Sequence, residues 1–142
     1  MNTTFEVKLM ILKLFLALNI FTAFQPFISQ ESPITSSKPV IKSIYTNYPK
    51  DGIWVSIPKG TKKITFHVEA ENTETVLFWL IPTGTQTWTE RKLIGYDIQE
   101  NQNDNNFSLT WNIDKPDLLD HLHIQAIGEE IVANDLINLY ME

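Results

Sequence analysis

Apolar and polar residues alternate with a period of two in one segment after another from Val40 to the end of the chain. The clearest example is Lys63–Ala70 (KITFHVEA), in which every second residue is apolar. This period is that of a β-strand with one buried face, because successive side chains of a strand point to opposite sides. Turn signals such as Pro58–Gly60 (PKG) close the segments, and helical periodicity does not recur among them. The sequence therefore predicts an all-β fold.

The alternating segments divide the chain into about eight short strands, and turn signals stand at short intervals between them. This density of strands predicts a β-sandwich or a small barrel, and the lack of crossover helices excludes a parallel α/β architecture. The expected strands lie at Val40–Tyr45, Ile53–Ile57, Lys63–Ala70, Thr75–Ile81, within Trp88–Tyr96, at Phe107–Ile113, around Leu122–Ala126 and at Ile131–Tyr140.

Short stretches of these segments resemble the bacterial immunoglobulin-like domains of exported and surface proteins. The resemblance spans most of residues 40–140, and it implies an immunoglobulin-like β-sandwich of about seven or eight antiparallel strands. It also implies a spacer, adhesive or accessory module rather than an enzyme. The stretches that carry it are Ile64–Ala70, Val76–Phe78, Gly84-Thr85, Leu93–Asp97, Phe107–Trp111 and His123–Ala126.

The first 30 residues differ in kind from the rest of the chain. Lys8 and Lys13 precede an uncharged run of 11 residues, Leu14–Phe24 (LFLALNIFTAF). Such a run fits the hydrophobic region of a signal peptide better than a membrane span, which needs about 20 apolar residues. We therefore expect residues 1–30 to be a signal peptide, and the protein to be secreted.

The cleavage site of this leader is only weakly marked, with Ala23 and Ser29 as the two candidates for its last residue. An uncleaved N-terminal anchor, which would hold the protein at the membrane surface, therefore stays open as an alternative. Residues 31–39 are rich in Ser and Pro and are expected to form a linker, with the sandwich domain at 40–142. Frequent Ile, Lys and Asn with a single Arg indicate an AT-rich bacterial genome.

Composition excludes several classes of function. The net charge of −6 provides no basic surface for nucleic acid or anionic lipid, so we expect neither partner, and no membrane contact beyond the N-terminal segment. Cys is absent, which excludes thiol catalysis, zinc ribbons and a disulfide scaffold. Hydrophobic residues make up 43% of the chain, enough for a core that holds the domain together without such cross-links.

No motif for catalysis, metal or cofactor binding stands out. His121 and His123 share one strand face, but His67 is expected on the opposite sheet and no third ligand is evident. Asp97–Asn106 (DIQENQNDNN) is rich in oxygen donors but lacks the Gly and terminal Glu of a calcium loop, which favours a solvated hairpin loop. No G-x-S-x-G motif is present. We expect a protein that is not an enzyme and uses no cofactor or metal.

The segment Thr75–Ile81 (TVLFWLI) is apolar on both faces. Its even-numbered residues are expected in the core, so its odd-numbered residues point outward. In an immunoglobulin-like sheet this strand, C, lies beside strands F and G, and their outward residues form one C–F–G face. Two alternatives stay open: a register slip that buries Trp79, and a covering of the face by the linker or the segment around Trp88. The candidate binding residues are Leu77, Trp79, Ile81, His121, His123 and Tyr140.

The leading hypothesis is a secreted or cell-surface binding module that recognises a protein, or a second copy of itself, through the C–F–G face around Trp79. One alternative is an accessory domain for polysaccharide, in which Trp54, Trp79 or Trp88 stacks on sugar rings. Another is a hydrolase or inhibitor whose site no motif reveals.

Overall fold

The computed structural model describes residues 37–84, 88–101 and 104–142. The expected leader at 1–30 and the first part of the expected linker lie outside the described residues, as do both candidate cleavage positions. The described part of the chain contains no helix that is long and apolar enough to cross a membrane.

Nine β-strands and one short 3-10 turn make up the regular structure of the described residues. The segments with period-two alternation form the strands, and the Pro- and Gly-containing segments between them form turns. The elements are β1 (Val40–Thr46), β2 (Lys50–Asp51), β3 (Trp54–Ile57), β4 (Lys63–Glu71), β5 (Thr75–Pro82), η1 (Trp88–Glu90), β6 (Lys92–Ile98), β7 (Asn106–Asn112), β8 (Leu119–Ile127) and β9 (Val132–Met141).

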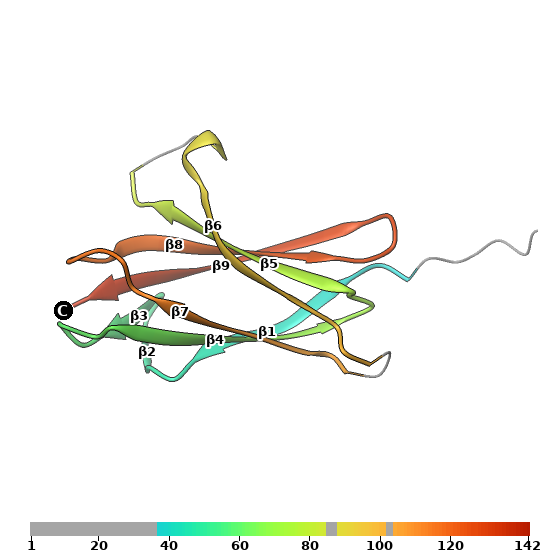
Figure 1. The fold of residues 1–142 in the computed structure, drawn as a ribbon, viewed down its shortest axis with the longest axis horizontal. Helices are drawn as coiled ribbons and strands as arrows, with labels where there is room; N and C mark the ends of the chain where they lie inside the picture. Colours follow the sequence, from blue (N-terminus) through green and yellow to red (C-terminus); the bar gives the residue numbers. More distant parts are fainter. Residues whose placement is uncertain (1–36, 85–87, 102–103) are drawn as a thin grey trace, which may run out of the picture. The chain divides into compact units, whose positions relative to one another are not determined.

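The strands form two sheets that pack as two layers (Figure 1). One sheet has three strands in the order β1-β4-β7, and the other has six in the order β2-β3-β9-β8-β5-β6. The chain thus divides its strands between the layers as an immunoglobulin-like sandwich does, with β5, β8 and β9 as neighbours in one sheet. The predicted all-β sandwich is confirmed.

One pairing differs from the expected antiparallel arrangement. Strand β3 pairs in parallel with β9, with Trp54 opposite Asn138 and Ile57 opposite Met141. The chain passes from β1, at the edge of the three-stranded sheet, to β2 at the edge of the six-stranded sheet, and then to β3. This crossing leaves β3 with the same direction as the last strand, and local alternation along the sequence carries no information about that direction.

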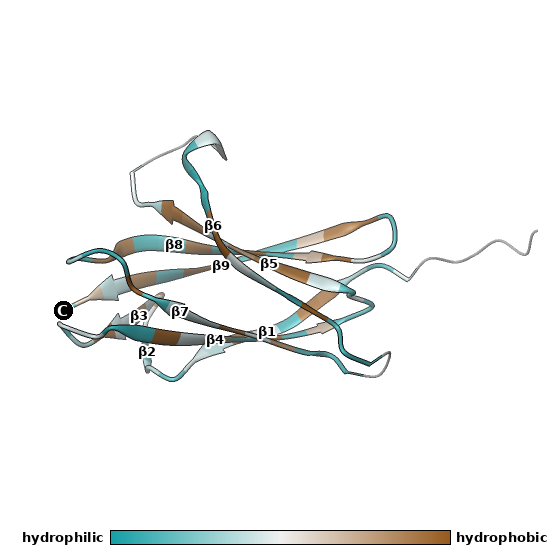
Figure 2. Cartoon of the chain, in the orientation of Figure 1, coloured by the Kyte–Doolittle hydropathy of each residue, from teal (hydrophilic) through white to brown (hydrophobic). Residues whose placement is uncertain are grey.

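The core lies between the two sheets and is formed by the inward half of each alternating strand. Figure 2 shows hydrophobic and hydrophilic residues following one another along the strands. Phe66 of β4 and Phe78 of β5 are fully buried, and their rings stack across the two sheets with centroids 6.3 Å apart. Burying side chains of this size stabilises the sandwich by roughly 1.5–3 kcal/mol each, without any disulfide.

A bulge in the pairing of β5 with β6 sets which residues of the edge strand point outward. The register shifts between Phe78 and Trp79, so that Trp79 faces Leu93 whereas Phe78 faces Gly95. A Cβ atom at Gly95 would lie 2.5 Å from Cδ1 of Leu109 in β7, so a larger residue would require the side chain of Leu109 to shift. The bulge therefore brings Leu93 to the outside, beside Trp79.

The segment expected to hold a strand from Trp88 to Tyr96 differs at its start. Residues Trp88–Glu90 form the 3-10 turn, and the strand begins only at Lys92. At the other end, Asp97 belongs to β6 rather than to the polar loop, and one of its carboxylate oxygens accepts a hydrogen bond of 2.7 Å from the backbone N–H of Ser108. Residues 102 and 103 of that loop lie outside the described residues.

Candidate functional site

Strand β5 separates its residues cleanly between the core and the outside. Val76, Phe78 and Leu80 are buried in the core, whereas Leu77, Trp79 and Ile81 point away from it and are half-buried. The alternative register, in which Trp79 belongs to the core, is therefore wrong. We call the surface that these outward residues share with their neighbours in β3, β9, β8 and β6 the outer face of the six-stranded sheet.

The sheet register brings the candidate residues together on the outer face. Trp79 lies opposite His123, which in turn lies opposite Leu136 of β9. Ile81 lies opposite His121 in the next row, and Tyr140 lies beyond it towards β3.

Arg91 covers the indole ring of Trp79. Its guanidinium carbon lies 4.1 Å from the ring centroid, a cation–π contact that stabilises by about 0.5–1 kcal/mol at an exposed site. The indole Nε1–H of Trp79 is buried and has no hydrogen-bond partner among the described residues. The ring is thus held by packing and by Arg91, the only arginine of the chain.

His123 lies on the outer face, opposite Trp79, as the alternation predicts. Its side chain is only 4% exposed there. Nε2 lies 3.1 Å from Oδ1 of Asn134, which requires a proton on that nitrogen. Burial lowers the pKa of His123 below its ordinary value, the hydrogen bond to Asn134 raises it, and the charge of Arg91 lowers it. The net direction favours the neutral form of His123, so this side chain adds no charge beside that of Arg91.

His121 belongs to a separate chain of contacts near β3. Its Nδ1 lies 2.7 Å from Oδ1 of Asn138, and Nδ2 of Asn138 donates a hydrogen bond of 3.0 Å to the carbonyl of Ile53. The ring of Trp54 stacks on the ring of His121 with centroids 6.4 Å apart. The sequence placed His121 on the outer face but gave no sign that Trp54 would lie beside it.

The outer face also exposes several large apolar side chains that were not among the candidates. Most exposed large hydrophobic residues in the described part of the chain lie here. They are Leu93, Tyr96, Ile98, Leu119, Val132, Leu136 and Tyr140. For the members on β8 and β9, the sequence signal is the absence of charge, because the outward positions of β5, β8 and β9 hold no Asp, Glu, Lys or Arg.

The outside of the three-stranded sheet is different in character. Thr65 and Thr110 hydrogen-bond to each other at 3.0 Å, and Glu69 accepts a hydrogen bond from Ser43 at 3.4 Å. Tyr45 is the exception, and its exposed ring stacks on His67 at 4.9 Å. This sheet presents an ordinary polar surface to water.

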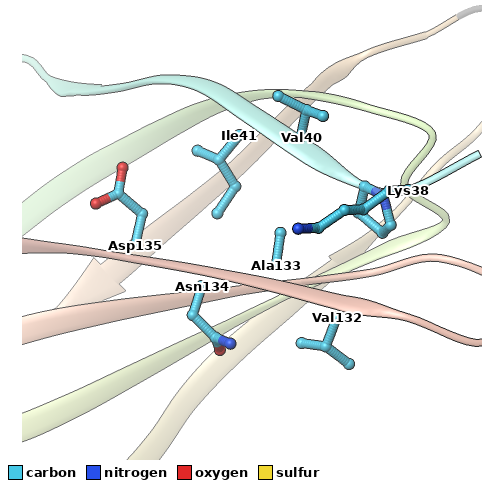
Figure 3. A pocket seen from close by; sticks show the side chains of 8 residues that line it. Lys38, Val40, Ile41, Val132, Ala133, Asn134 and Asp135 are labelled. Atoms are coloured by element: carbon cyan, nitrogen blue, oxygen red, sulfur yellow. The ribbon is translucent and has the colours of Figure 1, made fainter.

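The surface of the described residues includes a pocket and a groove. The pocket, of about 320 Å³, lies at the β3 end of the outer face and is lined by Asp51, Trp54, Ser56 and Tyr140. The groove, of about 420 Å³, lies between β1 and β9 and is shown in Figure 3. Apolar side chains such as Ile41 and Val132 line this groove together with Lys38, Asn134 and Asp135. Within the described residues, no three His, Cys, Asp or Glu side chains are placed to hold a metal ion.

No family model and no curated protein matches the chain. Among solved structures, an LPMO from Kitasatospora papulosa is similar with a TM-score of 0.47 and 7% identity, over 61% of this chain and 50% of that one. A chain from a structure of T cell specificity and activation by the bacterial superantigen toxic shock syndrome toxin-1 is similar with a TM-score of 0.49 and 10% identity, over 70% of this chain and 98% of that one. The present chain thus spans half the length of the LPMO chain.

Proposed function

We propose that this protein is an exported, non-enzymatic binding module of the bacterial immunoglobulin-like kind, and that it binds another protein through its outer face around Trp79. The partner that we propose first is a second copy of the chain. The observation that carries this proposal is the contrast between the two sheets. The outward positions of β5, β8 and β9 in the six-stranded sheet carry no charged residue, whereas the outer surface of the three-stranded sheet is polar.

Exposed apolar side chains gathered on one face of a soluble domain mark an interaction surface, because their contact with water is unfavourable. Leu93 lies opposite Trp79, Tyr96 opposite the neighbouring Leu77, and Leu136 beyond His123. All three are more than 40% exposed. Aromatic residues and arginine are both enriched at interface centres, and both are present here, with Arg91 over the ring of Trp79.

The size of the outer face fits a dimer. The face is five strands wide at a spacing of about 4.8 Å, and its central strand has nine residues that each rise about 3.4 Å. Width multiplied by length gives an area of roughly 700 Å². A stable interface of standard size buries about 800 Å² per partner. A flat sheet can pack on a copy of itself about a two-fold axis, in which case both copies cover their apolar surface at once.

The test is the mass of the purified protein in size-exclusion chromatography with light scattering. Native protein is expected to run as a dimer, and Leu136→Glu and Trp79→Glu as monomers, because a carboxylate in an apolar interface must be desolvated. Thr110→Glu, on the other sheet, is the matched control and is expected to remain a dimer. A native monomer with the same mass as all three variants would contradict self-association.

A further inference from the structure

The pocket at the β3 end of the outer face is built from a hairpin and the last strand. Strands β2 and β3 are joined by a tight turn at Gly52, whose φ of 58° is one that glycine adopts easily. This turn places Asp51 of β2 opposite Trp54 of β3. Parallel pairing then sets Ser56 opposite Tyr140 of β9, so that four side chains enclose about 320 Å³.

The indole of Trp54 is fixed in place by its neighbours before any ligand arrives. His121 stacks against it with an angle of 28° between the ring planes. His121 is itself held by Asn138, which is bonded to the carbonyl of Ile53, the residue before Trp54. A ring supported in this way loses little conformational freedom on binding, which favours affinity.

Polar groups surround the two aromatic rings of the pocket. The carboxylate of Asp51 is exposed and takes part in none of the ion pairs among the described residues. The hydroxyl of Ser56 donates a hydrogen bond to Oε1 of Glu142, and the side chain of Tyr140 is 44% exposed. Acceptors and a donor therefore lie at the rim, and apolar ring surface lies between them.

We propose that this pocket binds one pyranose ring of a glycan. A pyranose has an apolar C–H face that packs on an indole ring, and hydroxyl groups around its edge that hydrogen-bond to polar side chains. Trp54 and Tyr140 supply the ring surface, and the carboxylate of Asp51 accepts charge-assisted hydrogen bonds from the sugar hydroxyls. The pocket lies at the small end of the roughly 300–1,000 Å³ range of ligand sites, which suits a single ring.

The test is a titration of the ¹⁵N-labelled protein with gluco-, manno-, galacto- and N-acetylgluco-tetrasaccharides, followed by the indole N–H signals in NMR. The chain has four tryptophans, and the signal of Trp54 is identified by its loss in Trp54→Phe. At least one sugar is expected to move this signal. We expect a dissociation constant in the millimolar range, because a single sugar ring makes few contacts with the protein. No movement of the Trp54 signal with any of the sugars would overturn the proposal.

Variants then assign the interaction to the pocket. Asp51→Asn, at an exposed position on the two-residue strand β2, is expected to weaken binding at least threefold without unfolding the protein. Tyr45→Ala removes an exposed aromatic ring from the other sheet and is expected to leave the affinity unchanged. Equal affinity of native and Asp51→Asn, or binding of choline in place of all the sugars, would also overturn the glycan site.

The glycan site and the proposed self-association are tested separately. A sugar titration of Leu136→Glu is expected to move the Trp54 signal as in the native protein, because Leu136 does not line the pocket. Movement of the Trp54 signal therefore supports the glycan site and its absence contradicts it, whether the native protein is a monomer or a dimer.

Discussion

His123 shows at the scale of one residue how the sheet holds a titratable side chain in its neutral form. Its ring is flanked in the sheet by Trp79 and Leu136, and burial is the largest cause of its lowered pKa. Arg91 is the charged group that acts on it, and Asn134 accepts its hydrogen bond. A neutral imidazole can lie in an apolar interface, whereas an imidazolium would have to be desolvated first.

The lowered pKa makes the stability of the fold dependent on pH. The folded chain binds a proton at His123 less readily than the unfolded chain, whose histidine has the ordinary value of 6.5. The contribution of His123 to the free energy of unfolding is therefore complete above the unfolded pKa of 6.5. It is lost as the pH falls from 6.5 towards the lower pKa of the folded chain. We expect the urea midpoint of native protein to fall between about pH 7.5 and pH 5.5.

His123→Gln is expected to show a smaller fall of the urea midpoint over the same range, since it removes the titrating group. His67→Gln, on the other sheet, is the control and is expected to keep the native dependence. If His123→Gln and native protein show equal slopes, burial of His123 does not determine the pH dependence.

At the scale of strands, the sequence predicts the elements far better than their partners. Alternation located eight of the nine strands and identified the inward residues of β4 and β5. It missed β2, which has only two residues and no alternation. It also missed the parallel pairing of Trp54 with Asn138, because such contacts join segments far apart in the chain.

The candidate site was predicted in the same partial way. Trp79 was placed on the outer face because both neighbours in β5 are apolar and fill the core. The burial of His123 was missed, since it results from side chains on two other strands that the sequence does not place beside it. Leu93 was missed because a bulge, which alternation does not reveal, decides its direction.

An ion pair at the start of β8 stabilises the end of the sandwich. Asp120 is 1% exposed, and its carboxylate lies 2.6 Å from Nζ of Lys115. Lys115→Met is expected to lower the free energy of unfolding by about 1–3 kcal/mol, because it leaves a buried carboxylate without its counter-charge. Chemical denaturation followed by tryptophan fluorescence measures this change.

A second lysine provides the control for this measurement. The ion pair of Lys92 with Asp114 is exposed on both sides, so Lys92→Met is expected to leave the free energy of unfolding nearly unchanged. Equal effects of the two substitutions would show that burial of Asp120 does not set the strength of its ion pair.

For the whole molecule, the two outer surfaces of the sandwich have separate characters. The outer surface of the three-stranded sheet carries hydroxyl and charged groups. The six-stranded sheet carries an apolar centre around Trp79 and, at its β3 end, a small aromatic pocket at Trp54. We infer a module with one surface for water and one for partners.

Hydroxyl-radical footprinting tests this inference most directly, because it reports the exposure of individual side chains. Tyr96 on the outer face is 60% exposed and Tyr45 on the other sheet is 54% exposed, so the two rings are matched probes in one molecule. As protein concentration rises, self-association through the outer face predicts that Tyr96 is oxidised progressively less while Tyr45 is unaffected. Equal oxidation of both rings at every concentration, or protection of Tyr45 alone, would contradict it.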